Sequence, residues 1–207
     1  RIPEIAREGV PLEKIFRQFQ MLCLEEGADW VPYLAGGAGQ SGYLDVISPA
    51  TESPLGKGDV LMLDTGLVHD GYFCDFDRNW SVGRPGGAVT DAYARLIEAT
   101  EAGAQQARSG ATAADVFHAM NKVLTIGSDS TDAGRLGHGL GMSLTEWPSL
   151  IAEDHTVLEP GMVLTLEPGV TVADSTARIM VHEENILVTD GAPRFLSPRA
   201  EREMIAL

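Results

Sequence analysis

The stretch DVLMLDTGLVHDGYFCDFDRNWSV, residues 59–82, decides the fold of this chain. It reads as an apolar strand over 60–63 that delivers the acid Asp64 into a glycine turn, followed by a second strand that carries Asp75 back. Facing residues of a β-hairpin have Cβ atoms only about 5 Å apart, so the two acids can meet across it. Large apolar residues stand beside both acids, which argues against neutralisation by solvent.

Two carboxylates at such close range need a positive partner. At a separation of about 4 Å, two negative charges repel by about 4 kcal/mol at an effective dielectric constant near 20. Either a cation joins them, or one of the two carboxyl groups holds a proton. The rest of the sequence offers ligands for such a cation.

Composition limits the possible partners. The chain of 207 residues suits one domain or two small lobes, and its hydrophobic content of 44% is ordinary for a globular protein. A net charge of -15 argues against nucleic acid and anionic membranes, because both need a basic face. No apolar run approaches the roughly 20 residues of a membrane span. We interpret the two cysteines, Cys23 and Cys74, as reduced core thiols of a cytoplasmic protein.

Helical periodicity predicts three helices. Apolar residues recur at helical spacing over about residues 11–26. Thr90 or Asp91 is expected to cap a second helix, and a third is expected over about 112–124. The glycine-rich segment 33–45 is expected to be a strand that breaks into a loop.

The chain also contains an internal repeat. Residues 6–9 match 107–110 at an offset of 101, and residues 58–66 match 161–169 at an offset of 103. Each half therefore offers a helix, then a strand with an acid at its end, then a second hairpin strand with another acid. Two halves that face each other would gather four carboxylates around a pseudo-twofold axis. These acids are Asp64 and Asp75 in the first half, and Glu167 and Glu183 in the second.

Four converging carboxylates predict a pair of divalent cations. His138 adds a nitrogen ligand, and the glycines that flank it allow close approach of the backbone. Oxygen-rich ligands with one imidazole and no thiolate suit Mn(II), Fe(II) or Co(II) better than a structural zinc. Two metal ions bridged by carboxylates can activate a shared water and polarise a carbonyl group. The predicted metal ligands are Asp64, Asp75, His138, Glu167 and Glu183.

Five motifs follow one another along nearly the whole chain. They are Asp64-x-Gly66, Gly71-Tyr72-x-x-Asp75-x-x-Arg78, Gly137-His138-Gly139-x-Gly141, Glu167-Pro168-Gly169 and Glu183-Glu184-Asn185-Ile186-Leu187-Val188-Thr189. Together they resemble the motifs of the pita-bread metallohydrolases, which include methionine aminopeptidase, aminopeptidase P, prolidase and creatinase. The tail Leu196-Ser197-Pro198-Arg199 is similar to that of the proline-peptidase branch.

The resemblance implies an α+β pita-bread fold, with a curved antiparallel sheet, helices on its outer face and metals at its centre. It implies that residues 1–207 form one catalytic domain that follows an N-terminal domain, and that two chains form a homodimer. It implies that the five ligands hold two divalent metal ions (Mn, Co or Fe), and that a metal-bound water attacks the peptide bond of an Xaa-Pro substrate. Glu167 and Glu183 are then the catalytic carriers of the proton.

Two histidines of the peptidase members have no counterpart here. Thr145-Glu146 stands in place of a His-Glu pair, and Gly42 is the best match for a histidine in the loop before the first metal strand. A hydroxyl donates a hydrogen bond but carries no charge, and loss of one such donor costs on the order of 100- to 1000-fold in rate. Asp77 stands where the family commonly has threonine. These departures leave three hypotheses: an Xaa-Pro peptidase, a creatinase-like hydrolase of a small non-peptide amide, and a catalytically silent metal-binding protein.

Candidate substrate contacts lie near the predicted metal ligands in the sequence. We expect the partner to be a peptide or a small amide, without nucleic acid or membrane. Two aromatic residues are candidates for the pocket wall, and Arg78 is a candidate either for a substrate contact or for an ion pair with the acids. The predicted substrate-binding residues are Thr145, Trp147, Tyr43 and Arg78. The other histidines are expected to be structural or exposed: His69, His118, His155 and His182.

Overall fold

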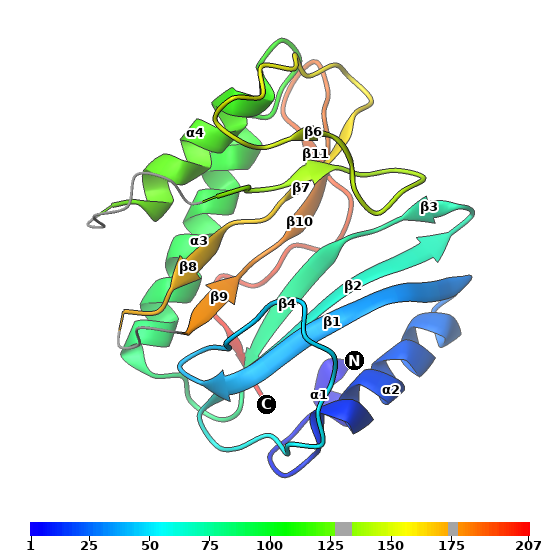
Figure 1. Ribbon diagram of the computed structural model, residues 1–207, viewed down its shortest axis with the longest axis vertical. Coiled ribbons are helices and arrows are strands. Elements are labelled where there is room, and N and C mark those ends of the chain that lie inside the picture. The colour runs from blue at the N-terminus through cyan, green and yellow to red at the C-terminus, as the bar shows by residue number, and fades with distance from the viewer. Residues whose placement is uncertain (127–133, 174–177) are drawn as a thin grey trace.

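The chain forms a mixed α+β fold in the computed structural model, which describes residues 1–126, 134–173 and 178–207. Two sheets lie next to each other, with the pair α3–α4 along one of them and α2 along the other (Figure 1). This is the α+β class that the sequence predicted. The helices are α1 (Ile2–Ile5), α2 (Leu12–Glu25), α3 (Gly87–Gln106) and α4 (Ala113–Leu124).

The first sheet has the strand order β1-β2-β4-β12, with β3 beside β2, and its pairings are antiparallel apart from the parallel pair β4–β12. Its strands are β1 (Trp30–Gln40), β2 (Asp59–His69), β3 (Tyr72–Phe73), β4 (Phe76–Ser81) and β12 (Ile205–Ala206). The second sheet has the order β11-β10-β7-β5-β6, and β8 pairs separately with β9. Its strands, with that separate pair, are β5 (His138–Gly139), β6 (Glu146–Ser149), β7 (Val163–Leu166), β8 (Gly169–Thr171), β9 (Ile179–Val181), β10 (Glu184–Leu187) and β11 (Arg194–Phe195).

Local sequence signals explain two of the three predicted helices. The helices predicted over 11–26 and 112–124 are confirmed as α2 and α4, and α4 begins with a capping box between Thr112 and Asp115. The predicted cap of α3 is wrong, because the helix already begins at Gly87 and no side chain caps it. The Thr90 hydroxyl donates instead to the Gly86 carbonyl, one turn back.

The glycine turn predicted directly after Asp64 is also wrong. Strand β2 continues through Gly66 to His69, because β1 pairs with it along its length, and the chain turns only at Asp70-Gly71. The register of β2 and β4 places Asp64 opposite Asp77 and not opposite Asp75. Asp64 and Asp75 are therefore not cross-strand neighbours, which corrects the expectation that they meet directly across the hairpin.

Two apolar clusters anchor the sheets to their helices. One joins α1 and α2 to β2 and β4 through residues such as Ile15, Phe16 and Leu61, and the other joins α3 and α4 to the second sheet through residues such as Leu96 and Leu164. Burial of each such side chain stabilises the fold by roughly 1.5–3 kcal/mol. The two sheets have different strand orders, so the topology does not by itself establish the predicted internal repeat, which stays a prediction.

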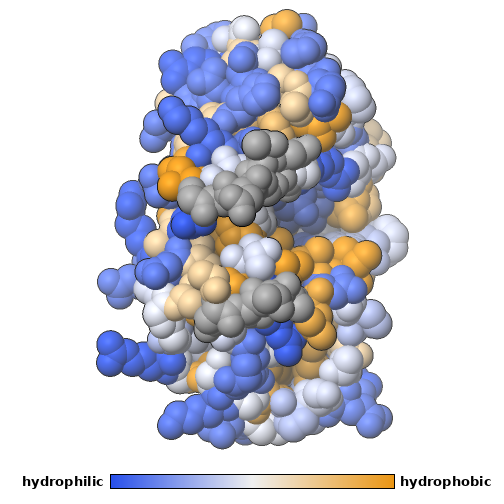
Figure 2. Space-filling model, turned by 60° about the vertical axis from the view of Figure 1, so that its left-hand side comes forward, coloured by the Kyte–Doolittle hydropathy of each residue, from blue (hydrophilic) through white to orange (hydrophobic). Residues whose placement is uncertain are grey.

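The surface agrees with the composition. Hydrophilic residues predominate on the face shown in Figure 2, and apolar residues gather near its middle. In the described part of the chain, no helix has both the length and the apolar character that crossing a membrane requires. Cys23 is buried, Cys74 is half-buried, and both are free thiols.

Gly137 allows β5 to lie against β7, and we expect Gly137→Ala to destabilise the fold severely. A Cβ at this residue would lie 2.2 Å from the Thr165 carbonyl oxygen, and its φ of +141° is one that side chains rarely adopt. We expect a loss of about 3 kcal/mol or more in the free energy of unfolding, measured by urea denaturation. The matched control is Gly110→Ala, where φ is +87° but no atom lies within 4 Å, and there we expect a loss of only about 1 kcal/mol. Equal losses for the two variants would contradict this explanation.

Candidate metal centre

The five predicted ligands come from both sheets. Asp64 lies within β2, and Asp75 lies in the gap between β3 and β4. His138 begins β5, Glu167 directly follows β7, and Glu183 directly precedes β10. All five therefore stand on or next to strands whose positions are fixed by pairing within a sheet.

Three of the five converge to a single point. Asp75, His138 and Glu183 each place a ligand atom within 4.8 Å of the other two, and all three residues are buried. The shortest ion pair of the group joins His138 Nε2 to Asp75 Oδ2 at 3.5 Å. Two carboxylates and one imidazole at this spacing suit a divalent ion of the Mn, Fe or Co type.

Asp64 and Glu167 lie outside this group of three residues, but the charge of Asp75 raises the pKa of both. Burial raises the pKa of Asp64 to about 7, with further upward contributions from Asp75 and Glu167. Burial also raises the pKa of Glu167, and repulsion from Asp75 adds to that effect. The structure thus gathers the acids of both sheets into one electrostatically coupled group.

The imidazole of His138 is oriented for a role as a ligand. Its Nδ1 lies 2.8 Å from the Gly139 carbonyl oxygen, which can only accept, so Nδ1 carries the proton and Nε2 offers its lone pair. Nε2 then faces the Asp75 carboxylate, an arrangement that needs a proton or a metal ion between the two. Burial alone would lower the pKa of His138, but the contacts with Asp75 and the Gly139 carbonyl outweigh it and raise the pKa.

Several buried carboxylate oxygens of this group have no hydrogen-bond partner within the described ranges of the chain. They are Asp64 Oδ1, Glu167 Oε2 and Glu183 Oε1. Burial raises the pKa of Glu183 well above its usual value, and repulsion from Glu167 and Asp75 raises it further. Buried polar atoms are almost always paired, so unpaired acceptors at one place fit a bound cation. The residues present therefore fit the metal ions that the sequence predicted.

Two residues near the acids were not predicted from the sequence. The Tyr33 hydroxyl donates to Asp64 Oδ2 at 2.9 Å. The Leu144 side chain packs against Gly66, where a Cβ added to Gly66 would lie only 2.3 Å from Leu144 Cδ1. Tyr33 reaches Asp64 because β1 pairs with β2 in a register that places Tyr33 opposite Gly66. Neither residue has a distinctive local motif, so only the strand register could have revealed them.

Two predicted substrate contacts have structural positions instead. Tyr43 is only 1% exposed, and its hydroxyl bonds Asn79 Oδ1 and the Val181 N–H, so it packs between the halves and is almost closed to solvent. The Arg78 guanidinium pairs with Glu184 at 2.8 Å and also donates to the Glu183 carbonyl. A cation engaged in this way joins the two sheets and confirms the ion pair with an acid that was one of the two expectations for Arg78.

The other two predicted substrate contacts remain candidates. Thr145 is exposed in the segment before β6, and this segment is held against the first sheet by the Phe73 N–H, which donates to the Gly141 carbonyl at 2.8 Å. Trp147 is 68% exposed, and its Nε1 donates to the Thr156 hydroxyl at 2.9 Å. Both side chains are therefore accessible to a ligand.

Asp77, which replaces a threonine of the family, lies buried on β4. Its carboxylate is 3.9 Å from His182 Nδ1, and His182 in turn lies 3.6 Å from Glu184. Burial raises the pKa of Asp77 well above its usual value, and the charge of Asp64 raises it further. The additional acid thus adds a buried carboxyl group opposite Asp64 whose charged form is disfavoured.

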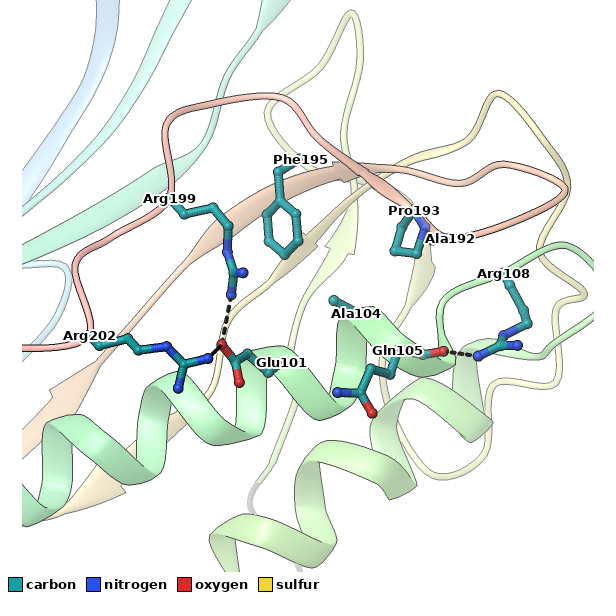
Figure 3. Close-up of a pocket in the computed structure, with 9 residues that line it drawn as sticks. All are labelled: Glu101, Ala104, Gln105, Arg108, Ala192, Pro193, Phe195, Arg199 and Arg202. Atoms are coloured by element: carbon teal, nitrogen blue, oxygen red, sulfur yellow. Dashed lines mark hydrogen bonds and ion pairs between the residues drawn. The ribbon is translucent and has the colours of Figure 1, made fainter.

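Three cavities in the described part of the chain are lined by none of the five predicted ligands. One of about 470 Å³ is lined by Arg108 and by Arg199 and Arg202, whose guanidinium groups both point to Glu101 at 3.1 and 2.8 Å (Figure 3). Two mainly apolar cavities, of about 800 and 610 Å³, share Leu67 and Phe76 in their walls. Because side chains alternate along a strand, Leu67 of β2 faces away from Asp64.

Known proteins resemble the chain in sequence and in structure. It is 32% identical over 169 residues to an Xaa-Pro dipeptidase of Pyrococcus horikoshii, a match that covers 80% of this chain and 47% of the relative. It is 32% identical over 196 residues to a probable dipeptidase PepE of Mycobacterium bovis, covering 93% of this chain and 51% of the relative. The crystal structure of dipeptidase PepE from Mycobacterium ulcerans superimposes with a TM-score of 0.90 at 26% identity, covering 100% of this chain and 55% of the other.

These likenesses agree with the fold and with the motifs. The chain spans about half the length of the relatives that it matches. The model of one family, described as metallopeptidase family M24, matches residues 1–190. That match covers all five motifs and every converging side chain described above. The chain therefore belongs to metallopeptidase family M24, and its fold is the pita-bread fold.

Proposed function

We propose that residues 1–207 form the catalytic domain of a metal-dependent hydrolase that cleaves a peptide or amide bond, with Xaa-Pro peptides as its reference substrates. The observation that carries the proposal is the group of buried, unpaired carboxylate oxygens beside the imidazole of His138. Relatives named Xaa-Pro dipeptidase and probable dipeptidase support the substrate class. Assembly as a homodimer and a cytoplasmic location, which the family resemblance implies, belong to the same proposal.

The five side chains would hold two divalent ions, with Mn, Co or Fe as the candidates. When bound, such ions lower the pKa of a water molecule and polarise a carbonyl group. Asp75, His138 and Glu183 already surround one point, and Asp64 and Glu167 are the remaining ligands of the proposed pair. Tyr33 holds Asp64 in place through its hydroxyl.

The proton of the attacking water needs an acceptor among this chain's own residues. Glu167 Oε2 and Glu183 Oε1 are the candidates, because both are buried and neither has a hydrogen-bond partner among the described residues. A carboxylate whose ionised form is disfavoured by burial accepts a proton more readily than one in water. The same oxygen atom can then return the proton to the leaving amine.

A creatinase-like activity on a small non-peptide amide is the second candidate. The observation in its favour is Thr145, which is exposed in the segment where peptidase members carry a histidine. A neutral hydroxyl cannot supply the positive charge of an imidazolium, so the substrate preference can differ from that of the relatives.

We predict that the chain hydrolyses Xaa-Pro dipeptides in the presence of Mn(II) or Co(II), and that Asp75→Asn and Glu167→Ala each lower the rate at least about 100-fold. Asp75 lies against His138, and Glu167 has an unpaired oxygen, so each change removes a proposed ligand. The measurement is the release of free proline. Asp190→Asn, which changes an exposed acid, is the matched control and should keep full activity.

The substrate panel separates the candidates. It contains Xaa-Pro dipeptides, longer peptides with proline in the second position, and small cyclic and guanidino amides. Turnover of the amides alone would replace the peptidase proposal with the creatinase-like one. No turnover of any substrate by the metal-loaded protein would remove both hydrolase proposals and favour a silent metal-binding protein.

A second prediction concerns the charge of the metal-free centre. Because burial and Glu167 raise the pKa of Glu183, the folded protein holds a proton that the unfolded chain releases above its ordinary pKa. Folding stability must therefore fall as the pH rises above the ordinary glutamate pKa. In a chelator at about pH 8, we expect Glu183→Gln to unfold with a free energy on the order of 1–3 kcal/mol higher than wild type.

The same two proteins should differ much less at about pH 4.5, close to the pKa of an ordinary glutamate. Addition of Mn(II) should reverse the order at about pH 8, because wild type gains the full stabilisation of the bound ions and Glu183→Gln does not. Urea denaturation with and without metal measures all of these differences. A lower stability of Glu183→Gln in the chelator would show that its carboxylate is stabilising and already paired.

A further inference from the structure

Asp75 lies where the first sheet is interrupted. Strand β3 ends at Phe73 and β4 begins at Phe76, and the Cys74 N–H still donates to the Leu67 carbonyl on β2 at 3.0 Å. Pairing with β2 resumes only at Phe76, which stands opposite Thr65. Within the described ranges, the backbone N–H and C=O of Asp75 bond to no other backbone group.

The side chain of Asn185 supplies the missing partner. Its Oδ1 accepts from the Asp75 N–H at 3.0 Å, and its Nδ2 donates to the Asp75 carbonyl. A primary amide offers the same donor and acceptor as a peptide group, so this side chain replaces a neighbouring strand at the interruption. Asn185 is only 3% exposed, and solvent has little access to take its place.

This contact joins the two sheets. Asn185 belongs to β10 of the second sheet and follows Glu183 by two residues, while Asp75 belongs to the first sheet. Strands β4 and β10 lie beside each other without a ladder of backbone hydrogen bonds, and side chains bridge them (Figure 1). Another amide, on Asn79 of β4, donates through its Nδ2 to the Val181 carbonyl on β9 at 2.7 Å. The Asn185 bridge holds the backbone of a proposed metal ligand, whereas the Asn79 bridge does not.

We propose that Asn185 is a positioning residue that sets the Asp75 carboxylate against His138 and Glu183, an inference that rests on the proposed metal centre. The backbone conformation of a residue limits where its carboxylate can lie. Metal ligands must be held within about 0.5 Å of the geometry that binds the ion. Without the amide, the N–H and C=O of Asp75 must find other partners, and the backbone turns with them. Outer contacts that orient metal ligands are worth about 10- to 100-fold in metal affinity.

The chemistry of the amide is specific. An aspartate at residue 185 would turn a carboxylate oxygen toward the Asp75 carbonyl and add a charge beside Glu183, and an aliphatic side chain would leave both backbone groups unpaired. An amide of this length offers its acceptor and its donor, on separate atoms, to the N–H and the C=O of one residue.

The test compares Asn185→Ala with Asn79→Ala, since both remove a buried amide that links the first sheet to the second half of the chain. Metal-free proteins are titrated with Mn(II), and free Mn(II) is followed by electron paramagnetic resonance. We expect Asn185→Ala to weaken Mn(II) binding 10- to 100-fold, in line with the loss of an outer contact. Asn79→Ala should stay within about threefold of wild type, although urea denaturation should show a similar loss of stability for both.

If Asn185→Ala does not fold, Asn185→Thr replaces it, because threonine favours strands. We expect Asn185→Thr to weaken Mn(II) binding to the same extent. Wild-type Mn(II) affinity in a folded Asn185 variant overturns the inference, and so does equal weakening in Asn79→Ala, which would indicate a general loosening of the junction. Failure of wild type itself to bind Mn(II) or Co(II) would instead overturn the proposed metal centre. The two failures are therefore distinguishable.

Discussion

Negative charge held away from water, at the junction of two sheets, is the constraint on which the rest of this structure depends. The carboxyl groups of Asp64, Glu167 and Glu183 each leave a buried oxygen without a partner among the described residues. Burial is the largest cause of the raised pKa of all three groups. Such an arrangement costs folding free energy when it stands alone, and a cation bound by these oxygens would offset that cost.

The junction is built so that ligands from both sides can meet. A continuous ladder between β4 and β10 would hold the strands about 4.8 Å apart and direct their side chains to the two faces. Instead, side chains link the first sheet to the second half of the chain. Arg78 donates to the Glu183 carbonyl, Asn79 donates to the Val181 carbonyl, and Asn185 bonds the Asp75 backbone. The Asp75 backbone is thereby released from the ladder with β2, and its carboxylate reaches His138. The interruption between β3 and β4 therefore belongs to the architecture of the site, because it frees Asp75 from pairing with β2.

Membership in family M24 and the particular residues of this chain answer different questions. The family motifs account for the ligand set and for the fold that carries it. Thr145, Asp77 and Leu144 are residues of this chain that surround that set. Tyr33 has features of both sets of residues. Its hydroxyl contacts the predicted ligand Asp64, and its position is set by the register of β1 on β2.

The sequence by itself determined the helices α2 and α4, the α+β class, the family and the identity of the acids and the histidine. Local periodicity and side-chain chemistry encode these features, so they can be recognised without coordinates. Only the tertiary structure decided that Asp64 faces Asp77, that Tyr43 is buried, that Arg78 pairs with Glu184 and that Asn185 holds the Asp75 backbone. The last two contacts join residues more than 100 positions apart, and such contacts depend on how the two sheets meet, which no local pattern records.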